Sequence, residues 1–214
     1  MLPRMRCHTD PMTTARELAR LERAEFAELL GGLTPEQWSA PSLCAEWTVH
    51  DVATHTIAYL GQSRIRLAIN MVRARLDVNR LNGGLADRRR LTPEQCVDAM
   101  RHGVEPSGAA ALYGGCVALI ECLIHQQDIR RPLGLPRSIP EERLRASMNY
   151  ARVSPVIGAA RRTRGVRLVA TDMDWSAGRG PDVHGSGEVL LLAMTGRLAA
   201  VAGELEGDGV ALLR

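Results

Sequence analysis

The residues with the clearest capacity for chemistry lie in one segment, where two carboxylates and an imidazole are spaced at helical intervals. Glu121, His125 and Asp128 occupy positions i, i+4 and i+7. At about 100° per residue, all three fall on one face of a helix. Their neighbours at 117–120 and 123–124 are apolar, and ionisable groups on a buried helix are costly unless a partner compensates their charge. A divalent metal ion bound by Glu121 and His125 is one such partner.

A metal held by Glu121 and His125 needs a third ligand, because catalytic zinc sites hold three protein ligands and leave other positions to water or substrate. Two of the remaining histidines, His50 and His55, lie in a second predicted helix. They project about 140° apart, so they cannot readily share one ion. Apolar residues project near His55, whereas His50 falls in the first turn after Thr48, where exposure is expected. His55 is therefore the predicted third ligand.

These polar residues also permit simpler interpretations. Glu121 and His125 could form a buried hydrogen-bonded pair that needs no metal. Asp128 has two candidate roles: it orients a metal ligand or a coordinated water, or it forms a salt bridge with Arg130, Arg131 or another arginine. The sequence alone leaves these alternatives open.

Two stretches around these residues carry a resemblance to a known family. The first is Cys-Ala-Glu-Trp-Thr-Val-His-Asp-Val-Ala-Thr-His at residues 44–55, and the second is Glu-x-x-x-His-x-x-Asp-Ile-Arg-Arg-Pro-Leu-Gly at residues 121–134. Together they resemble the mycothiol-dependent maleylpyruvate isomerase family, within the DinB/YfiT-like metalloprotein superfamily. The resemblance spans residues 15–213 and departs from the family pattern at Thr54 and Thr56, neither of which is a ligand.

The resemblance implies a metal site, a thiol cofactor and an electrophilic substrate. In this family a divalent metal, usually zinc, is bound by one histidine of the second bundle helix and by a glutamate and a histidine of the last helix. These match His55, Glu121 and His125. The cofactor that the resemblance implies is mycothiol. Coordination to the metal would deprotonate its thiol at neutral pH. The thiolate is expected to add to an electrophilic small molecule, giving cis–trans isomerisation or S-transfer.

Arg197 is the residue expected to bind the substrate, because the resemblance places it where the C-terminal domain of the family offers an arginine to the site. A guanidinium fork suits the carboxylates of a dianionic substrate. Arg197 is equally compatible with a cation at a helix C-terminus, where the helix dipole favours it.

A different class of function also stays open. In this alternative the protein is a non-catalytic helical bundle that binds a metal together with a small ligand or a partner. Hydrolysis by a metal-bound water has less support, since Asp128 is the only evident general base.

Composition argues against nucleic-acid and membrane partners. All 27 basic residues are arginine, and the formal net charge is only +3, which is too small to predict nucleic-acid binding. No apolar run reaches the length of a membrane span. The five cysteines form no C-x-x-C pair and are odd in number, which predicts free thiols in a reducing, cytoplasmic setting. We expect a monomer or a homodimer.

The expected fold is mainly α: a DinB-like four-helix bundle followed by a small α+β domain. Residues 1–12 are predicted to be a disordered extension, 13–136 the metal-binding bundle of maleylpyruvate isomerase N-terminal type, and 137–214 the C-terminal domain. The bundle helices are expected at 14–30, 48–76, 92–101 and 110–130. The C-terminal domain is expected to contain a helix at 140–151, a strand at 166–171 and an amphipathic helix at 188–198.

Overall fold

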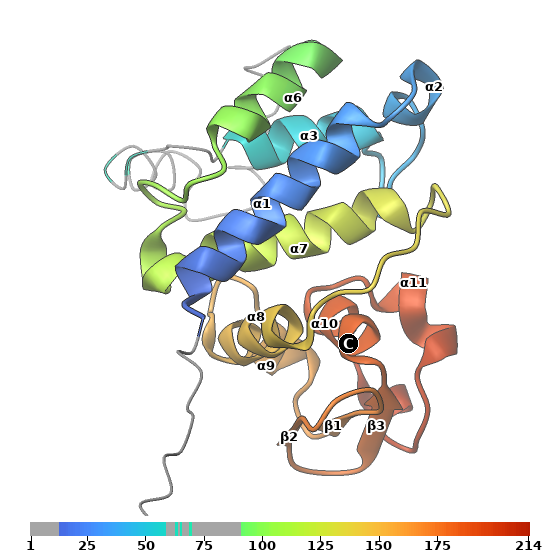
Figure 1. Ribbon diagram of the computed structural model, residues 1–214. Coiled ribbons are helices and arrows are strands. Elements are labelled where there is room, and N and C mark those ends of the chain that lie inside the picture. Colours follow the sequence, from blue (N-terminus) through green and yellow to red (C-terminus); the bar gives the residue numbers. More distant parts are fainter. Residues whose placement is uncertain (1–12, 59–62, 64, 66–68, 70–90) are drawn as a thin grey trace, which may run out of the picture.

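The computed structural model describes residues 13–58, 63, 65, 69 and 91–214. It confirms the mainly α fold expected from the sequence, with a helical bundle followed by a small part that combines helices and a three-stranded sheet. Figure 1 shows the bundle above and the C-terminal part below, with α7 (Cys116–Arg130) lying between them. The predicted extension at 1–12 falls outside the described residues. Among the helices in the described ranges, none has the length and apolarity needed to cross a membrane.

The helices of the bundle are α1 (Ala15–Gly31), the short α2 (Pro35–Trp38), α3 (Val49–Ala58), α6 (Pro93–His102) and α7. Three of them, α1, α2 and α6, begin at a capping threonine. Thr14, Thr34 and Thr92 each accept a hydrogen bond from a backbone N–H three residues on, and a Glu or Gln side chain at that position bonds back. These reciprocal bonds satisfy amide groups that the first turn of a helix leaves unpaired.

α7 holds the two parts together, because its side chains enter the apolar cores of both. Cys122 and Ile129 pack with side chains of α1, α3 and α6. Ile120, Leu123 and Ile124 pack with the C-terminal part. Burying a large apolar side chain stabilises a fold by roughly 1.5–3 kcal/mol, so these contacts fix α7 from two sides.

The C-terminal part is built around one strongly apolar helix, α10 (Gly187–Met194), which contacts α8 (Glu141–Val153) and the sheet. The strands are β1 (Arg167–Ala170), β2 (Ser176–Gly178) and β3 (Asp182–Gly185). Strand β1 is central, antiparallel to β2 and parallel to β3. The remaining elements are α9 (Ala159–Arg162), α11 (Leu198–Val201) and 3₁₀ turns at Ala202–Glu204 and Val210–Leu212.

The fourth bundle helix begins later than predicted. In place of a start at residue 110, the chain forms a 3₁₀ turn at Leu112–Gly115, and α7 begins at Cys116. Residues 113–115 all have positive φ angles, which a right-handed helix excludes. At Gly115 a Cβ would lie 2.8 Å from the Cα of Arg16, so glycine is what permits this turn to approach α1.

The second bundle helix is not the single helix predicted at 48–76. Its described part is Val49–Ala58. Ser63 is not helical, whereas Ile65 and Ile69 are helical again, so the prediction of one uninterrupted helix is wrong. Apart from 63, 65 and 69, the rest of the predicted span lies outside the described residues.

The helix predicted at 188–198 is interrupted, and the interruption bears on the site. α10 ends at Met194, and Gly196 adopts a φ of 94°, the left-handed conformation that commonly ends a helix. Arg197 therefore lies in a turn, after which the chain resumes as α11. The strand predicted at 166–171 is confirmed as β1, whereas β2 and β3 were not predicted.

A buried ion network joins α1 to the segment that leads into α8. The Glu22 carboxylate has no exposed surface and pairs with Arg137 at 2.6 Å and Arg143 at 2.9 Å. Gln126 of α7 donates to the same carboxylate at 2.7 Å, and Glu25 contacts both arginines. Because buried charges are costly without partners, each member depends on the others, and the network fastens the C-terminal part to the bundle.

We predict that Glu22→Gln lowers the free energy of unfolding by about 3 kcal/mol, as expected when one partner of a buried ion pair is removed. The loss should stay at the low end of the usual range, because Glu25 still contacts both arginines. Urea unfolding followed by circular dichroism measures the change. The matched control is Glu141→Gln, which breaks the exposed pair with Arg145 and should cost about 0.5 kcal/mol or less. Equal losses in the two variants would contradict a stabilising role for the network.

Candidate metal centre

The central side chain of the site is His125, which lies on α7 and is 5% exposed. Its Nε2 is 3.4 Å from Oε2 of Glu121, one helical turn earlier. Two ligands bound at about 2.0–2.1 Å to a tetrahedral zinc ion lie about 3.4 Å apart. This pair therefore already has the spacing of two zinc ligands.

His55 reaches the same place from α3. Its ring centroid is 5.0 Å from that of His125, with the two ring planes at 82°. Trp47 packs against the His55 ring with a centroid separation of 5.0 Å. One potential ligand atom from each of His55, Glu121 and His125 lies within 4.8 Å of the others. The structure thus brings together the three residues that the sequence singled out as potential metal ligands.

The other histidines with described positions lie in different surroundings. His50 Nε2 is 2.8 Å from the carbonyl oxygen of Leu91. His102 Nδ1 is 2.7 Å from the carbonyl oxygen of Asp98 at the end of α6. His184 belongs to β3 in the C-terminal part. The apolar surroundings that favoured His55 over His50 in the sequence are therefore found in the structure, where His55 is buried and His50 is only partly buried.

Asp128 fixes the orientation of His125. Its Oδ2 lies 2.8 Å from His125 Nδ1, and because an ionised carboxylate only accepts hydrogen bonds, Nδ1 is the donor. With Nδ1 engaged, Nε2 faces Glu121 and is the nitrogen left for a metal. A carboxylate behind a histidine in this way fixes the ring and increases its basicity as a ligand. This contact corresponds to one of the two roles considered for Asp128.

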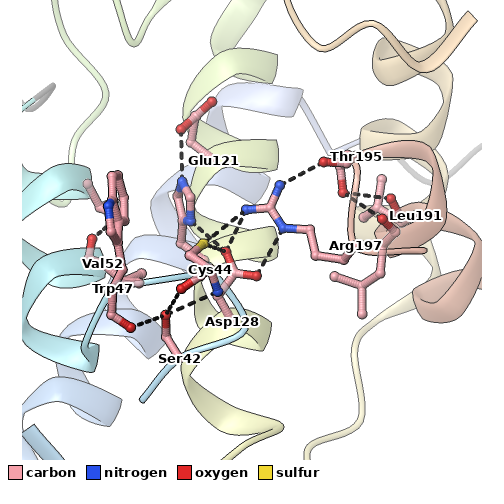
Figure 2. A network of polar contacts seen from close by, with 12 residues as sticks. Ser42, Cys44, Trp47, Val52, Glu121, Asp128, Leu191, Thr195 and Arg197 are labelled. Atoms are coloured by element: carbon pink, nitrogen blue, oxygen red, sulfur yellow. Dashed lines mark hydrogen bonds and ion pairs between the residues drawn. The ribbon is translucent and has the colours of Figure 1, made fainter. Parts of the chain in front are cut away.

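Arg197 reaches Asp128 from the turn between α10 and α11. Its Nε donates to Oδ1 at 3.0 Å and its Nη2 to Oδ2 at 2.6 Å, while Nη1 donates to the carbonyl oxygen of Thr195 at 2.7 Å. Figure 2 shows the guanidinium lying between Thr195 and Asp128. The arginine partner of Asp128 is therefore Arg197, and neither Arg130 nor Arg131. The Arg197 guanidinium, which was expected to bind a substrate carboxylate, binds the Asp128 carboxylate.

The sequence did not reveal Cys44 as a residue of this site. Its Sγ lies 3.2 Å from Asp128 Oδ2 and 3.6 Å from Arg197 Nη2, in the middle of the network drawn in Figure 2. The only signal in the sequence was its place at the beginning of the stretch 44–55.

The buried carboxylate and the guanidinium stabilise each other's charge. Burial opposes the ionisation of Asp128, but hydrogen bonds from His125 and Arg197 outweigh it and hold the pKa of the carboxyl well below its usual range. Burial also disfavours the charge of Arg197, yet the hydrogen bonds to Asp128 raise its pKa. At neutral pH both groups are therefore charged.

The two histidines respond to the site in opposite ways. Burial and the neighbouring His125 lower the pKa of His55 to about 4, so His55 is neutral at pH 7. Burial disfavours the charge of His125 too, but its hydrogen bonds with Asp128, Cys44 and Glu121 raise its pKa well above the usual value. A histidine must be neutral to ligate a metal. A metal ion at Nε2 of His125 would therefore replace the proton between the ring and the Glu121 carboxylate.

The residues present fit a divalent metal ion held by α3 and α7. Two imidazoles and one carboxylate are a donor set that suits zinc and leaves coordination positions open. A second group of potential ligands, Cys44, His125 and Asp128, also lies within 4.8 Å. That group is less suitable, because Asp128 Oδ2 is already paired with Arg197 and a cation there would have to displace the guanidinium.

Comparisons with known proteins agree with this fold. The family model of the Mycothiol maleylpyruvate isomerase N-terminal domain matches residues 19–113. Two crystal structures, of the mycothiol-dependent maleylpyruvate isomerase and of a histidine-to-alanine variant, are each 17% identical, with TM-scores of 0.53 and 0.55. Both comparisons cover 92% of this chain and 96% of the other. No curated protein gives a significant match. The family match includes His55 but ends before Glu121 and His125. The proximity of His55 to those two residues therefore rests on the structure and not on the family match.

We predict that Asp128→Asn weakens zinc binding by about 10–100-fold, as is usual when a group that orients a metal ligand is lost. The amide keeps the size of the side chain but removes the charge that holds His125 and Arg197. Competition with a chromophoric chelator measures the affinity. Asp98→Asn, at an exposed position of α6, is the matched control and should bind zinc as the parent does. Unchanged affinity in a folded Asp128→Asn variant would show that this carboxylate does not support a metal ligand.

Proposed function

We propose that this chain is a metal-dependent enzyme of the mycothiol maleylpyruvate isomerase type, with mycothiol as its thiol cofactor; the family-model match over residues 19–113 supports this. The observation that carries the proposal is the cluster of ligand atoms from His55, Glu121 and His125, which lie within 4.8 Å of one another. Zinc is the proposed metal, because two imidazoles and a carboxylate suit it. The proposed substrate is an electrophilic small molecule.

The bound metal would supply a cofactor thiolate at neutral pH, since coordination deprotonates a thiol. The protein's own residues prepare the place for it. His55 is neutral, Asp128 holds the His125 ring with Nε2 towards Glu121, and Trp47 packs against His55. The Glu121 side chain is 36% exposed, so the centre is open to cofactor and substrate on that side.

Bound mycothiol would supply a thiolate for addition to an activated cis double bond. Its later expulsion would give the trans isomer with no atom gained or lost, whereas uptake of a proton by the neighbouring carbon would give a thioether as the product of S-transfer.

Arg197 is our candidate for binding a carboxylate of the substrate. A guanidinium has five N–H donors, and four of them are directed to Asp128, Thr195 and Cys44. The second N–H of Nη1 has no contact recorded within the described part of the chain. We therefore propose a single contact from Nη1 to the substrate, because a full fork would require Asp128 to be displaced.

We predict about one zinc ion per chain in protein purified without a metal-chelating tag, and a loss of that zinc in His125→Ala. Elemental analysis by mass spectrometry measures both. His102→Ala, at an exposed histidine on α6, is the matched control and should keep its metal. A parent chain that binds no metal even after incubation with zinc would contradict the proposal and leave Glu121 and His125 as a buried polar pair.

We further predict that mycothiol binds only to the metal-loaded chain. With cobalt(II) in place of zinc, coordination of the cofactor sulfur should produce a sulfur-to-metal charge-transfer band, which absorption spectroscopy detects. Loaded protein should then isomerise or conjugate an electrophilic dicarboxylate such as maleylpyruvate. Metal binding without any thiol binding would instead indicate a non-catalytic bundle.

A further inference from the structure

We propose that Cys44 is a positioning residue of the metal centre, whose S–H holds the Asp128 carboxylate and, through it, the ring of His125. The inference rests on the proposed function, because the group being positioned is a proposed metal ligand. It assigns a role to a side chain that the proposed reaction does not use.

Three donors converge on one oxygen atom of Asp128. His125 Nδ1 lies 2.8 Å from Oδ2, Arg197 Nη2 lies at 2.6 Å and Cys44 Sγ at 3.2 Å. The sulfur also accepts from Arg197 Nη2 at 3.6 Å. Cys44 thus closes a ring of contacts between the carboxylate and the guanidinium (Figure 2). Removing it would leave both charged groups freer to shift, together with the imidazole that they orient.

The chain holds Cys44 firmly in this place. Ser42 Oγ accepts from the backbone N–H of Cys44 at 3.1 Å and donates to the carbonyl oxygen of Trp47 at 2.8 Å. The N–H of Leu43 donates to the carbonyl oxygen of Asp128 at 2.9 Å. The loop is therefore bound to Asp128 twice, once through the backbone and once through the thiol.

The backbone of this loop is also unusual. Glu46 has a φ of 64°, a left-handed conformation that few residues other than glycine adopt. A strained residue persists only where surrounding contacts enforce it. Here it lets Trp47 pack against His55 while Cys44 faces Asp128, so one short loop supports both proposed imidazole ligands.

The other described cysteines provide a contrast. Cys96 and Cys122 are buried in the apolar core of the bundle, and burial raises the pKa of the Cys122 thiol to about 12. Cys116 lies at the start of α7 and is only partly buried. It therefore offers a matched control for a cysteine substitution outside the Asp128 network.

The first experiment measures how fast zinc passes from the loaded full-length chain to an excess of chelator. We expect Cys44→Ala to weaken zinc retention by about tenfold, the lower end of the usual effect of such supporting groups, because S–H is a weaker donor than N–H. Cys44→Ser keeps a donor and should restore most of the retention. Cys116→Ala should behave as the parent does. The cobalt(II) absorption spectrum should change in Cys44→Ala and be largely restored in Cys44→Ser.

A reversible modification tests the same thiol without a substitution. Methyl methanethiosulfonate converts a thiol into an S–S–CH₃ group with release of methanesulfinate, so Cys44 loses its hydrogen. Zinc retention should fall in the treated parent and recover after reduction with dithiothreitol. The same treatment of Cys44→Ser should change nothing, which excludes effects from the other cysteines.

The outcomes separate this inference from the proposed function. Zinc retention and cobalt spectra in Cys44→Ala that match those of the parent would overturn the role of Cys44 and leave the metalloenzyme intact. A loss that Cys44→Ser does not restore would also overturn it, since the donor would then be irrelevant. A parent chain that binds no zinc would overturn both proposals.

Discussion

The buried carboxylate of Asp128 is the constraint on which the rest of the site depends. It has no exposed surface, and a charge in that position is tolerated only when hydrogen bonds and an opposite charge compensate it. Its partners come from three segments: His125 on α7, Cys44 in the loop before α3, and Arg197 in the turn after α10. All three must be in place for the carboxylate to be buried. One side chain thereby couples the metal-ligand candidates to the C-terminal part.

α7 can hold Asp128 and His125 in place because separate contacts on its other faces fix the orientation of the helix. The face with Glu121 and His125 is directed to α3, while Gln126 is hydrogen-bonded to the buried Glu22 on α1. A rotation of α7 that moved His125 would therefore break buried polar contacts on the other side, and an unsatisfied buried group costs about 1–3 kcal/mol. Below the helix, Leu123 packs into the core of the C-terminal part. Side chains held in this way on rigid elements have the preorganisation that a metal site requires.

The sequence predicted what depends on local pattern. Helical spacing and apolar neighbours identified the shared face of α7 and the choice of His55, and the starts expected at residues 14 and 92 lie within one residue of those of α1 and α6. What depends on distant contacts was not predictable. The late start of α7 follows from the approach of Gly115 to α1, and Arg197 reaches Asp128 only because Gly196 ends α10. Arg131, one of the arginines considered as a partner of Asp128, pairs with glutamates of the C-terminal part. Cys44 could not be recognised because a single cysteine carries no periodic signal.

The central claim is that His55, Glu121 and His125 hold one metal ion, and X-ray absorption spectroscopy of the zinc-loaded chain tests it most directly. Two imidazole nitrogens and oxygen ligands at about 2.0–2.2 Å, without sulfur, are the predicted coordination. After addition of mycothiol, one sulfur at about 2.3 Å should appear while both imidazoles remain. Sulfur bound before any thiol is added would place the ion on Cys44, and fewer than two imidazoles would exclude His55 or His125. Either result would contradict the account.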